Sequence, residues 1–143
     1  MSYFSSEAEI ERIGRGLIDC SLPKSEWTHV AHLAAALWLI RQSSLDAVRD
    51  MPRLIRAYNE ATGVANTDTG GYHETITLAS LRAANSWSLE HSRVSLHETV
   101  EGLLATKLAR SDWLLAYWSR PVLFSVAARR GWVEPDLQPF PFA

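Results

Sequence analysis

Residues 27–40 read WTHVAHLAAALWLI, and the second half of this stretch decides the fold class. From Val30 to Ile40 the side chains are apolar on nearly every face of a helix, whereas a surface helix keeps one polar face. The longest uninterrupted apolar run, residues 33–40, is eight residues long and too short to span a bilayer. The stretch therefore predicts a helix over residues 26–42, capped by Ser25 or Thr28 and buried on most of its sides.

Shorter helices are predicted on both sides of this buried segment. Ser6 with Glu9, and Ser95 with Glu98, are capping-box patterns that begin two of them. Pro52 lies inside a third, so either Asp50 restarts that helix or the helix kinks. The predicted ranges are 6–19, 45–61, 72–91, 96–109, 112–118 and 125–130.

No segment shows the alternating pattern of a β-strand, and no repeat or long linker divides the chain. We therefore predict an all-α fold in which residues 1–143 form one domain. It is expected to be a compact bundle of about five to seven helices around the buried second helix. Residues 132–143 carry three prolines and are expected to form an extended tail.

The composition excludes several classes of function. The 143 residues include 14 Lys and Arg against 16 Asp and Glu, a net charge of −2 that favours neither nucleic acid nor an anionic membrane as a partner. The single cysteine, Cys20, excludes an internal disulfide framework and a cysteine-rich zinc site. Near the start, Glu7, Glu9 and Glu11 stand where a signal peptide would need basic charge, so a cytoplasmic location is predicted.

Three of the five histidines lie near the starts of predicted helices. His29 and His32 are three residues apart, so their Cβ atoms lie about 5–6 Å apart on one face. The positive end of a helix dipole favours the neutral imidazole that a metal ligand or a general base requires. With His73 they predict a site for a divalent transition metal, zinc or iron, in which Glu74 is a ligand or general base. The structural alternative is that these histidines are hydrogen-bonded core residues. Two histidines three residues apart also arise by chance.

The loop at residues 62–71, TGVANTDTGG, precedes His73 and predicts a binding corner for a small substrate. Its glycines free the backbone just before a helix, where exposed N–H groups favour an anion. The alternative is that its Asn and Thr residues only form turns and caps. The expected substrate-binding residues are Trp27, Arg56, Tyr58, Asn66, Thr67, Asp68 and Tyr72.

A group of aromatic residues later in the chain has two interpretations. Trp113, Tyr117 and Trp118 are expected mainly in the core, because large aromatic side chains usually serve packing. With Arg120 and Phe124 they also match the composition of a pocket or of a homodimer interface.

Three strings resemble signatures of a family of small bacterial proteins to which no activity is attached. They span about a third of the chain and have the forms WTHxAH, NTxTxGYHETxT and GWVEPDL. The resemblance implies a bacterial protein and transfers no catalytic residue. The strings are WTHVAHLAAALW (residues 27–38), RAYNEATGVANTDTGGYHETIT (residues 56–77) and FSVAARRGWVEPDL (residues 124–137).

The leading functional prediction is a metal-dependent enzyme, hydrolytic or using oxygen, that acts on a small polar molecule. His29 and Glu74 are its expected catalytic residues, and the partner is a small molecule. A second hypothesis is a metal-free enzyme in which neutral His29 or His32 acts as base. A third is a non-catalytic module that binds a small molecule or a protein. No HExxH sequence, P-loop or dinucleotide fingerprint is present, so no nucleotide cofactor is expected.

Overall fold

The buried segment forms helix α2 (His29–Ile40), and the hydroxyl oxygen of Thr28 caps its start by accepting a hydrogen bond from the Ala31 N–H. The structure, a computed structural model, describes residues 2–143, which contain α-helices, three short 3₁₀ turns and no strand. The other α-helices are α1 (Glu7–Ile18), α3 (Ala47–Ala61), α4 (Glu74–Glu90), α5 (Leu96–Leu104), α6 (Arg120–Leu123) and α7 (Val126–Arg130). The 3₁₀ turns are η1 (Lys24–Glu26), η2 (Lys107–Ala109) and η3 (Trp113–Ala116). The predicted all-α bundle of five to seven helices is thus confirmed.

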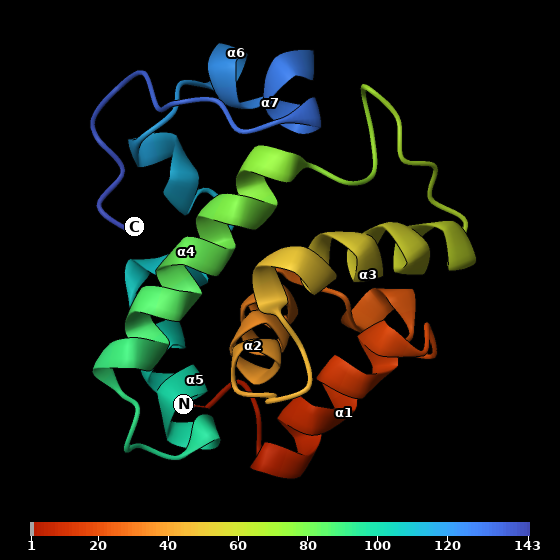
Figure 1. Ribbon diagram of the computed structural model, residues 1–143, viewed down its shortest axis with the longest axis vertical. Coiled ribbons are helices and arrows are strands. Elements are labelled where there is room, and N and C mark those ends of the chain that lie inside the picture. The colour runs from red at the N-terminus through yellow and green to blue at the C-terminus, as the bar shows by residue number, and fades with distance from the viewer. Residues whose placement is uncertain (1) are drawn as a thin grey trace.

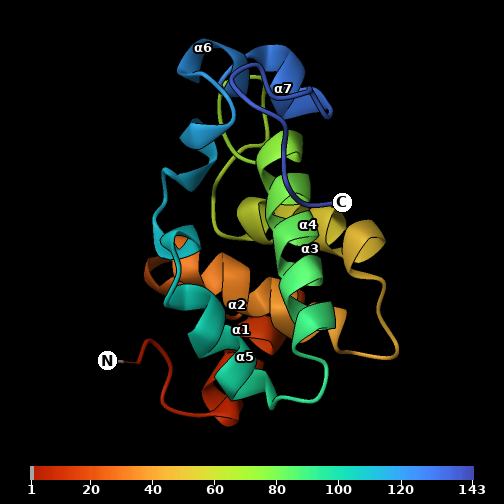
Figure 2. The same ribbon diagram turned by 90° about the vertical axis from the view of Figure 1, so that its left-hand side faces the viewer.

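Helix α2 is the centre of the bundle. It packs against α1, α3, α4 and α5, and Figure 1 shows it nearly end-on between α1, α3 and α4. Leu33, Leu37 and Leu39 have no exposed surface. This confirms the prediction that the apolar helix is buried on most of its sides. Helix α4 runs along the long axis of the molecule, from the end that holds α6 and α7 to the end that holds α5 (Figure 2).

Local hydrogen bonds explain where some helices differ from the predicted ranges. Helix α3 begins at Ala47 behind the Asp46 cap and continues through Pro52, so a restart at Asp50 is wrong. Helix α5 ends at Leu104, before the predicted residue 109. The Thr106 hydroxyl donates to the Leu103 carbonyl and accepts from the Leu108 N–H, and these bonds replace the helical ones.

The segment from 112 to 123 also differs from the prediction. Residues 113–116 form a 3₁₀ turn within the predicted range 112–118, and Pro121 stands in the first turn of α6, a helix that was not predicted. Proline fits there because the first N–H groups of a helix have no partner inside it.

Of the helices in residues 2–143, none is both long enough and apolar enough to cross a membrane.

The C-terminal tail, residues 132–143, forms no helix and folds back onto the start of α4. The Thr75 hydroxyl donates to the Gly131 carbonyl at 2.8 Å and accepts from the Val133 N–H at 3.2 Å. The indole N–H of Trp118 donates to the Val133 carbonyl at 3.0 Å. These bonds bring the tail, η3 and the start of α4 together at one end of the bundle.

Candidate functional site

A cleft of about 400 Å³ lies where α2, α3 and the start of α4 meet the loop at residues 62–73. This volume is within the range of roughly 300–1,000 Å³ that is usual for small-molecule sites. Its walls are mainly apolar and aromatic, formed by Trp27, Met51, Ile55, Tyr72 and Ile76. Trp27, His32, Tyr72 and His73 were all predicted as site residues, and the fold brings them to this one cleft.

His32 is the side chain in this cleft with the most unusual environment. Its ring stacks on Trp27 with 3.9 Å between the ring centroids and 28° between their planes. Burial, helped by the nearby His29, lowers the pKa of His32 from 6.5 to about 3. No hydrogen bond within residues 2–143 engages either ring nitrogen. His32 therefore presents a neutral ring with one unused donor and one unused acceptor.

His73 has a structural role, which agrees with the alternative of hydrogen-bonded core histidines. Its Nδ1 caps α4 by accepting from the Ile76 N–H at 3.1 Å. Its Nε2 lies 2.7 Å from the Leu123 carbonyl oxygen and must carry the proton, because a carbonyl only accepts. Burial lowers the pKa of His73, which keeps this tautomer neutral. Both ring nitrogens are thus engaged within the protein.

The predicted ligand set of His29, His32 and His73 is not assembled. Within the described part of the chain, no group of three His, Cys, Asp or Glu side chains is arranged to hold a metal ion. His29 donates from Nε2 to the Leu108 carbonyl at 2.7 Å and lines a different cavity from His32. The physical reason is that backbone carbonyls engage two of the three rings. Metal dependence stays a prediction, without a ligand set in this structure.

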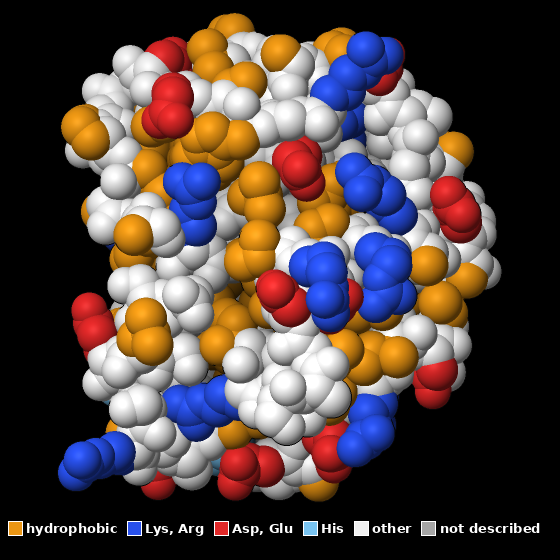
Figure 3. Space-filling view, viewed as in Figure 1, with side chains coloured by type: hydrophobic (Ala, Val, Ile, Leu, Met, Phe, Trp, Pro, Cys, Tyr) orange, Lys and Arg blue, Asp and Glu red, His pale blue; other side chains and the backbone are white. Residues whose placement is uncertain are grey.

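Glu74 is held by Tyr72 at the start of α4. The Tyr72 hydroxyl donates to Glu74 Oε1 at 2.5 Å. Burial and this carboxylate both raise the pKa of Tyr72. The Arg56 guanidinium carbon lies 4.2 Å from the Tyr72 ring centroid, and Figure 3 shows Lys and Arg side chains gathered over α3 on this face. Glu74 and Arg56 therefore hold Tyr72 in place at the wall of the cleft, but neither of them lines the cleft.

The loop residues predicted to bind substrate form hydrogen bonds within the protein that hold the loop in shape. Asn66 Oδ1 accepts from Asn59 Nδ2 at 3.0 Å and from the Tyr72 N–H at 2.9 Å. Thr67 accepts from the Thr69 N–H, and Asp68 forms two 2.7 Å bonds with Arg130. The alternative of turn formers and caps describes Asn66 and Thr67 better than the prediction of a binding corner.

Tyr58, also predicted to bind substrate, is fully buried in the core. Its hydroxyl donates to the Leu22 carbonyl at 2.8 Å, and its ring lies 5.5 Å from that of Trp27. It supports the Trp27 wall of the cleft from behind and does not line it.

Four polar residues that line the cleft are not among the expected site residues. They are Lys24, Asn59, Thr77 and Ser80. Positions 76, 77 and 80 lie on one face of α4, one and two turns after its cap, His73. This spacing, applied to the helix that follows the loop, could have identified Thr77 and Ser80.

Replacing Gly71 by alanine is expected to cost about 2 kcal/mol of stability, whereas Gly70→Ala is expected to be nearly neutral. Gly71 has a φ of +77°, and an added Cβ would lie 2.5 Å from the Ala65 carbonyl oxygen. At Gly70 the nearest atom would be Thr67 Oγ1 at 3.8 Å, an ordinary contact. Denaturant unfolding of both variants measures the difference, and equal costs would contradict this account of the loop.

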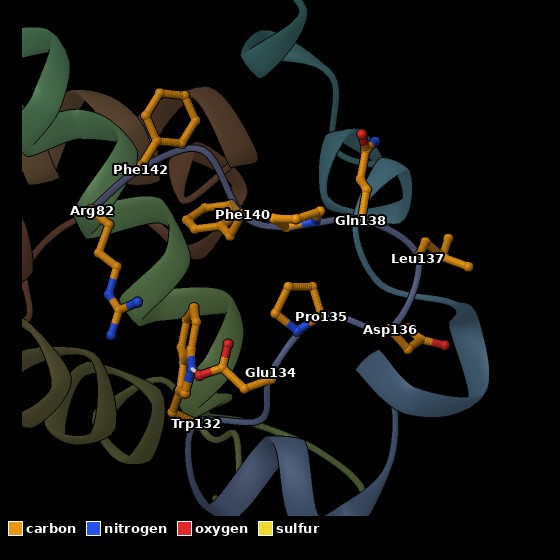
Figure 4. A pocket seen from close by; sticks show the side chains of 10 residues that line it. Arg82, Trp132, Glu134, Pro135, Asp136, Leu137, Gln138, Phe140 and Phe142 are labelled. Atoms are coloured by element: carbon orange, nitrogen blue, oxygen red, sulfur yellow. Dashed lines mark hydrogen bonds between the residues drawn. The ribbon is translucent and has the colours of Figure 1, made fainter.

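A larger hollow of about 570 Å³ lies under the C-terminal tail (Figure 4). Several of its polar groups already have partners in the protein: the Arg82 guanidinium carbon lies 3.9 Å from the Trp132 ring centroid, and the Trp132 indole N–H donates to Glu134 at 2.9 Å. Figure 4 shows Asp136 and Leu137 pointing away from Trp132. No predicted site residue lines this hollow, so the smaller cleft remains the candidate site.

No protein-family model, curated protein or solved structure matches this chain. The resemblance to a family of small bacterial proteins therefore stays a prediction.

Proposed function

We propose that the protein binds a small, flat heteroaromatic molecule in the cleft between α2, α3 and α4. The observation that carries this proposal is His32, a neutral ring with unused nitrogens on a largely apolar, aromatic surface. Aromatic walls favour a flat ligand, because ring faces gain by stacking. A few polar groups among apolar ones are what orient a small ligand in a pocket.

The polar groups of the cleft favour an uncharged ligand edge with a donor and an acceptor. Asn59 uses its Nδ2 on Asn66, which leaves its Oδ1 as an acceptor. Thr77 and Ser80 add hydroxyls that both donate and accept. Lys24 is the one charged side chain in the described lining, and it is exposed at the rim.

Binding is favoured over acid–base catalysis because of the basicity of His32. A general base works best when its pKa is near the operating pH. The pKa of about 3 makes His32 a weak base at neutral pH, although it remains a good hydrogen-bond partner.

Quinazolin-4-one is a suitable probe, since it is flat and carries a lactam N–H and carbonyl on one edge. The wild-type protein is expected to bind it saturably in a chemical-shift titration. His32→Phe keeps the aromatic stack but removes the ring nitrogens, so the Kd should rise about 5–10-fold, the value of one hydrogen bond. Ser80→Trp fills the cleft and should abolish binding.

Matched control variants exist for both substitutions. His91 also stacks on a tryptophan, Trp87, with 4.2 Å between centroids, but it does not line the cleft. His91→Phe should therefore leave the Kd unchanged. Leu89→Trp adds the same indole to an exposed position of α4 and should also leave it unchanged.

Two results would overturn the proposal. One is an unchanged Kd in both His32→Phe and Ser80→Trp. The other is a transition metal that copurifies with the wild-type protein, stays in His91→Phe and is lost in His32→Phe. That second result would favour the metal-dependent enzyme.

A further inference from the structure

Asn59, near the end of α3, is a polar side chain of the cleft with one unused group. It is 9% exposed and lines the cleft, and its Nδ2 donates to Asn66 Oδ1 at 3.0 Å. Its Oδ1 has no partner within residues 2–143. The one partnerless side-chain nitrogen or oxygen in these residues that is cut off from solvent belongs to Trp113, so Asn59 Oδ1 keeps accessible surface. A ligand in the cleft can therefore reach this oxygen.

Asn66 fixes which way the Asn59 amide points. Its own amide lies between two backbone groups: Nδ2 donates to the Arg56 carbonyl at 3.1 Å, and Oδ1 accepts from the Tyr72 N–H at 2.9 Å. A carbonyl only accepts and an N–H only donates, so Asn66 cannot turn its amide over without losing both bonds. It presents an acceptor to Asn59, which must therefore use its Nδ2 as the donor.

The backbone around the two amides holds them in place. A Cβ added at Gly71 would lie 2.7 Å from Asn66 Oδ1, so the loop backbone lies directly against this oxygen. The Asn59 carbonyl accepts from the Val64 N–H at 2.7 Å and from the Thr62 hydroxyl at 3.2 Å. The amide pair is therefore part of the junction between α3 and the loop.

The other uncharged polar groups of the cleft can adapt to a ligand. The hydroxyls of Thr77 and Ser80 both donate and accept, and the neutral ring of His32 carries one donor and one acceptor. Asn59 Oδ1 only accepts. Discrimination between a donor and an acceptor on the ligand edge therefore depends on Asn59.

We infer that Asn66 sets the specificity of the cleft by holding Asn59 as an acceptor, so that the cleft selects a ligand with a ring N–H over one with a ring oxygen. Asn66 is a positioning residue, since it does not line the cleft itself. A ring oxygen would leave Asn59 Oδ1 facing a second acceptor, without a donor. Turning Asn59 over would place its Oδ1 against Asn66 Oδ1. This inference rests on the proposed function and names the ligand class more closely.

Quinolin-2-one and coumarin test this selection, because they share one flat shape and differ by an N–H in place of a ring oxygen. In a chemical-shift titration the wild-type protein should bind quinolin-2-one about 10-fold more tightly than coumarin, the value of one buried hydrogen bond. Asn66→Ala frees the Asn59 amide to turn and donate to coumarin, so the ratio of the two Kd values should fall to about 2. A loosened loop alone would weaken both compounds and leave the ratio unchanged.

Two further variants of the same loop serve as controls. Asn66→Asp keeps an oxygen that accepts from Asn59 and from the Tyr72 N–H, so it should keep most of the ratio. Thr67→Ala removes the bond from the Thr69 N–H, which does not involve Asn59, and should keep the full ratio.

The outcomes separate this inference from the proposed function. If the wild type binds neither compound nor quinazolin-4-one, the proposed function fails and the inference fails with it. If quinazolin-4-one binds, the inference alone is overturned by equal Kd values for quinolin-2-one and coumarin, or by a ratio that Asn66→Ala leaves unchanged. It is also overturned if Asn66→Asp loses the ratio as fully as Asn66→Ala, because the order of the loop would then set the selectivity.

Discussion

Replacing Trp118 by alanine is expected to lower the free energy of unfolding by about 3–5 kcal/mol. Trp118 has no exposed surface, and its ring centroid lies 5.2 Å from that of Phe140 and 5.5 Å from that of Trp132. The substitution also leaves the Val133 carbonyl without its indole donor. Because the ring joins η3 to the tail, its loss should loosen both elements.

Thermal denaturation should show this loss as a drop in Tm of about 10–15 °C. Trp118→Phe, which keeps a ring but loses the N–H, should cost less than the alanine change. Leu89→Ala serves as the control, since Leu89 is 70% exposed and should change stability little. A Trp118→Ala variant within about 1 kcal/mol of the wild type would contradict the assignment of Trp118 to the core.

Acid is expected to destabilise the protein through His32, by about 2 kcal/mol between pH 7.5 and 5. In the unfolded chain His32 takes up a proton near its ordinary pKa of 6.5, whereas in the folded protein its pKa is about 3. Between these values the unfolded state binds more protons, so stability falls as the pH is lowered. The loss should reach about 3 kcal/mol at pH 4.

Denaturant unfolding as a function of pH measures this effect, and His32→Phe should remove most of it. His73 contributes in the same direction, since its pKa is also lowered, so some dependence on pH should remain. His91→Phe should keep the full pH dependence of the wild type. Equal pH profiles for the wild type and His32→Phe would refute the lowered pKa of His32 in the folded protein.

The amino-acid sequence was sufficient to predict the helical core. The apolar surface of residues 30–40 has only one stable environment, the interior, and the fold places α2 there. The capping side chains of Ser6, Thr28 and Ser95 act over three residues, so their bonds could also be predicted from local spacing. From the sequence, Trp27, His32 and Tyr72 could be predicted as site residues. That they line one cleft could not be predicted.

The roles of the histidines depended on the tertiary structure. His29 donates to a carbonyl 79 residues away, and His73 to one 50 residues away. No local pattern encodes where those carbonyls lie, because packing of η2 and α6 against the bundle sets their positions. Each carbonyl engages one ring nitrogen, and the three side chains are not arranged as the shared ligand set that the spacing had suggested. The ring of His32 stacks on the Trp27 indole at the wall of the cleft, and no protein group in residues 2–143 forms a hydrogen bond with its nitrogens.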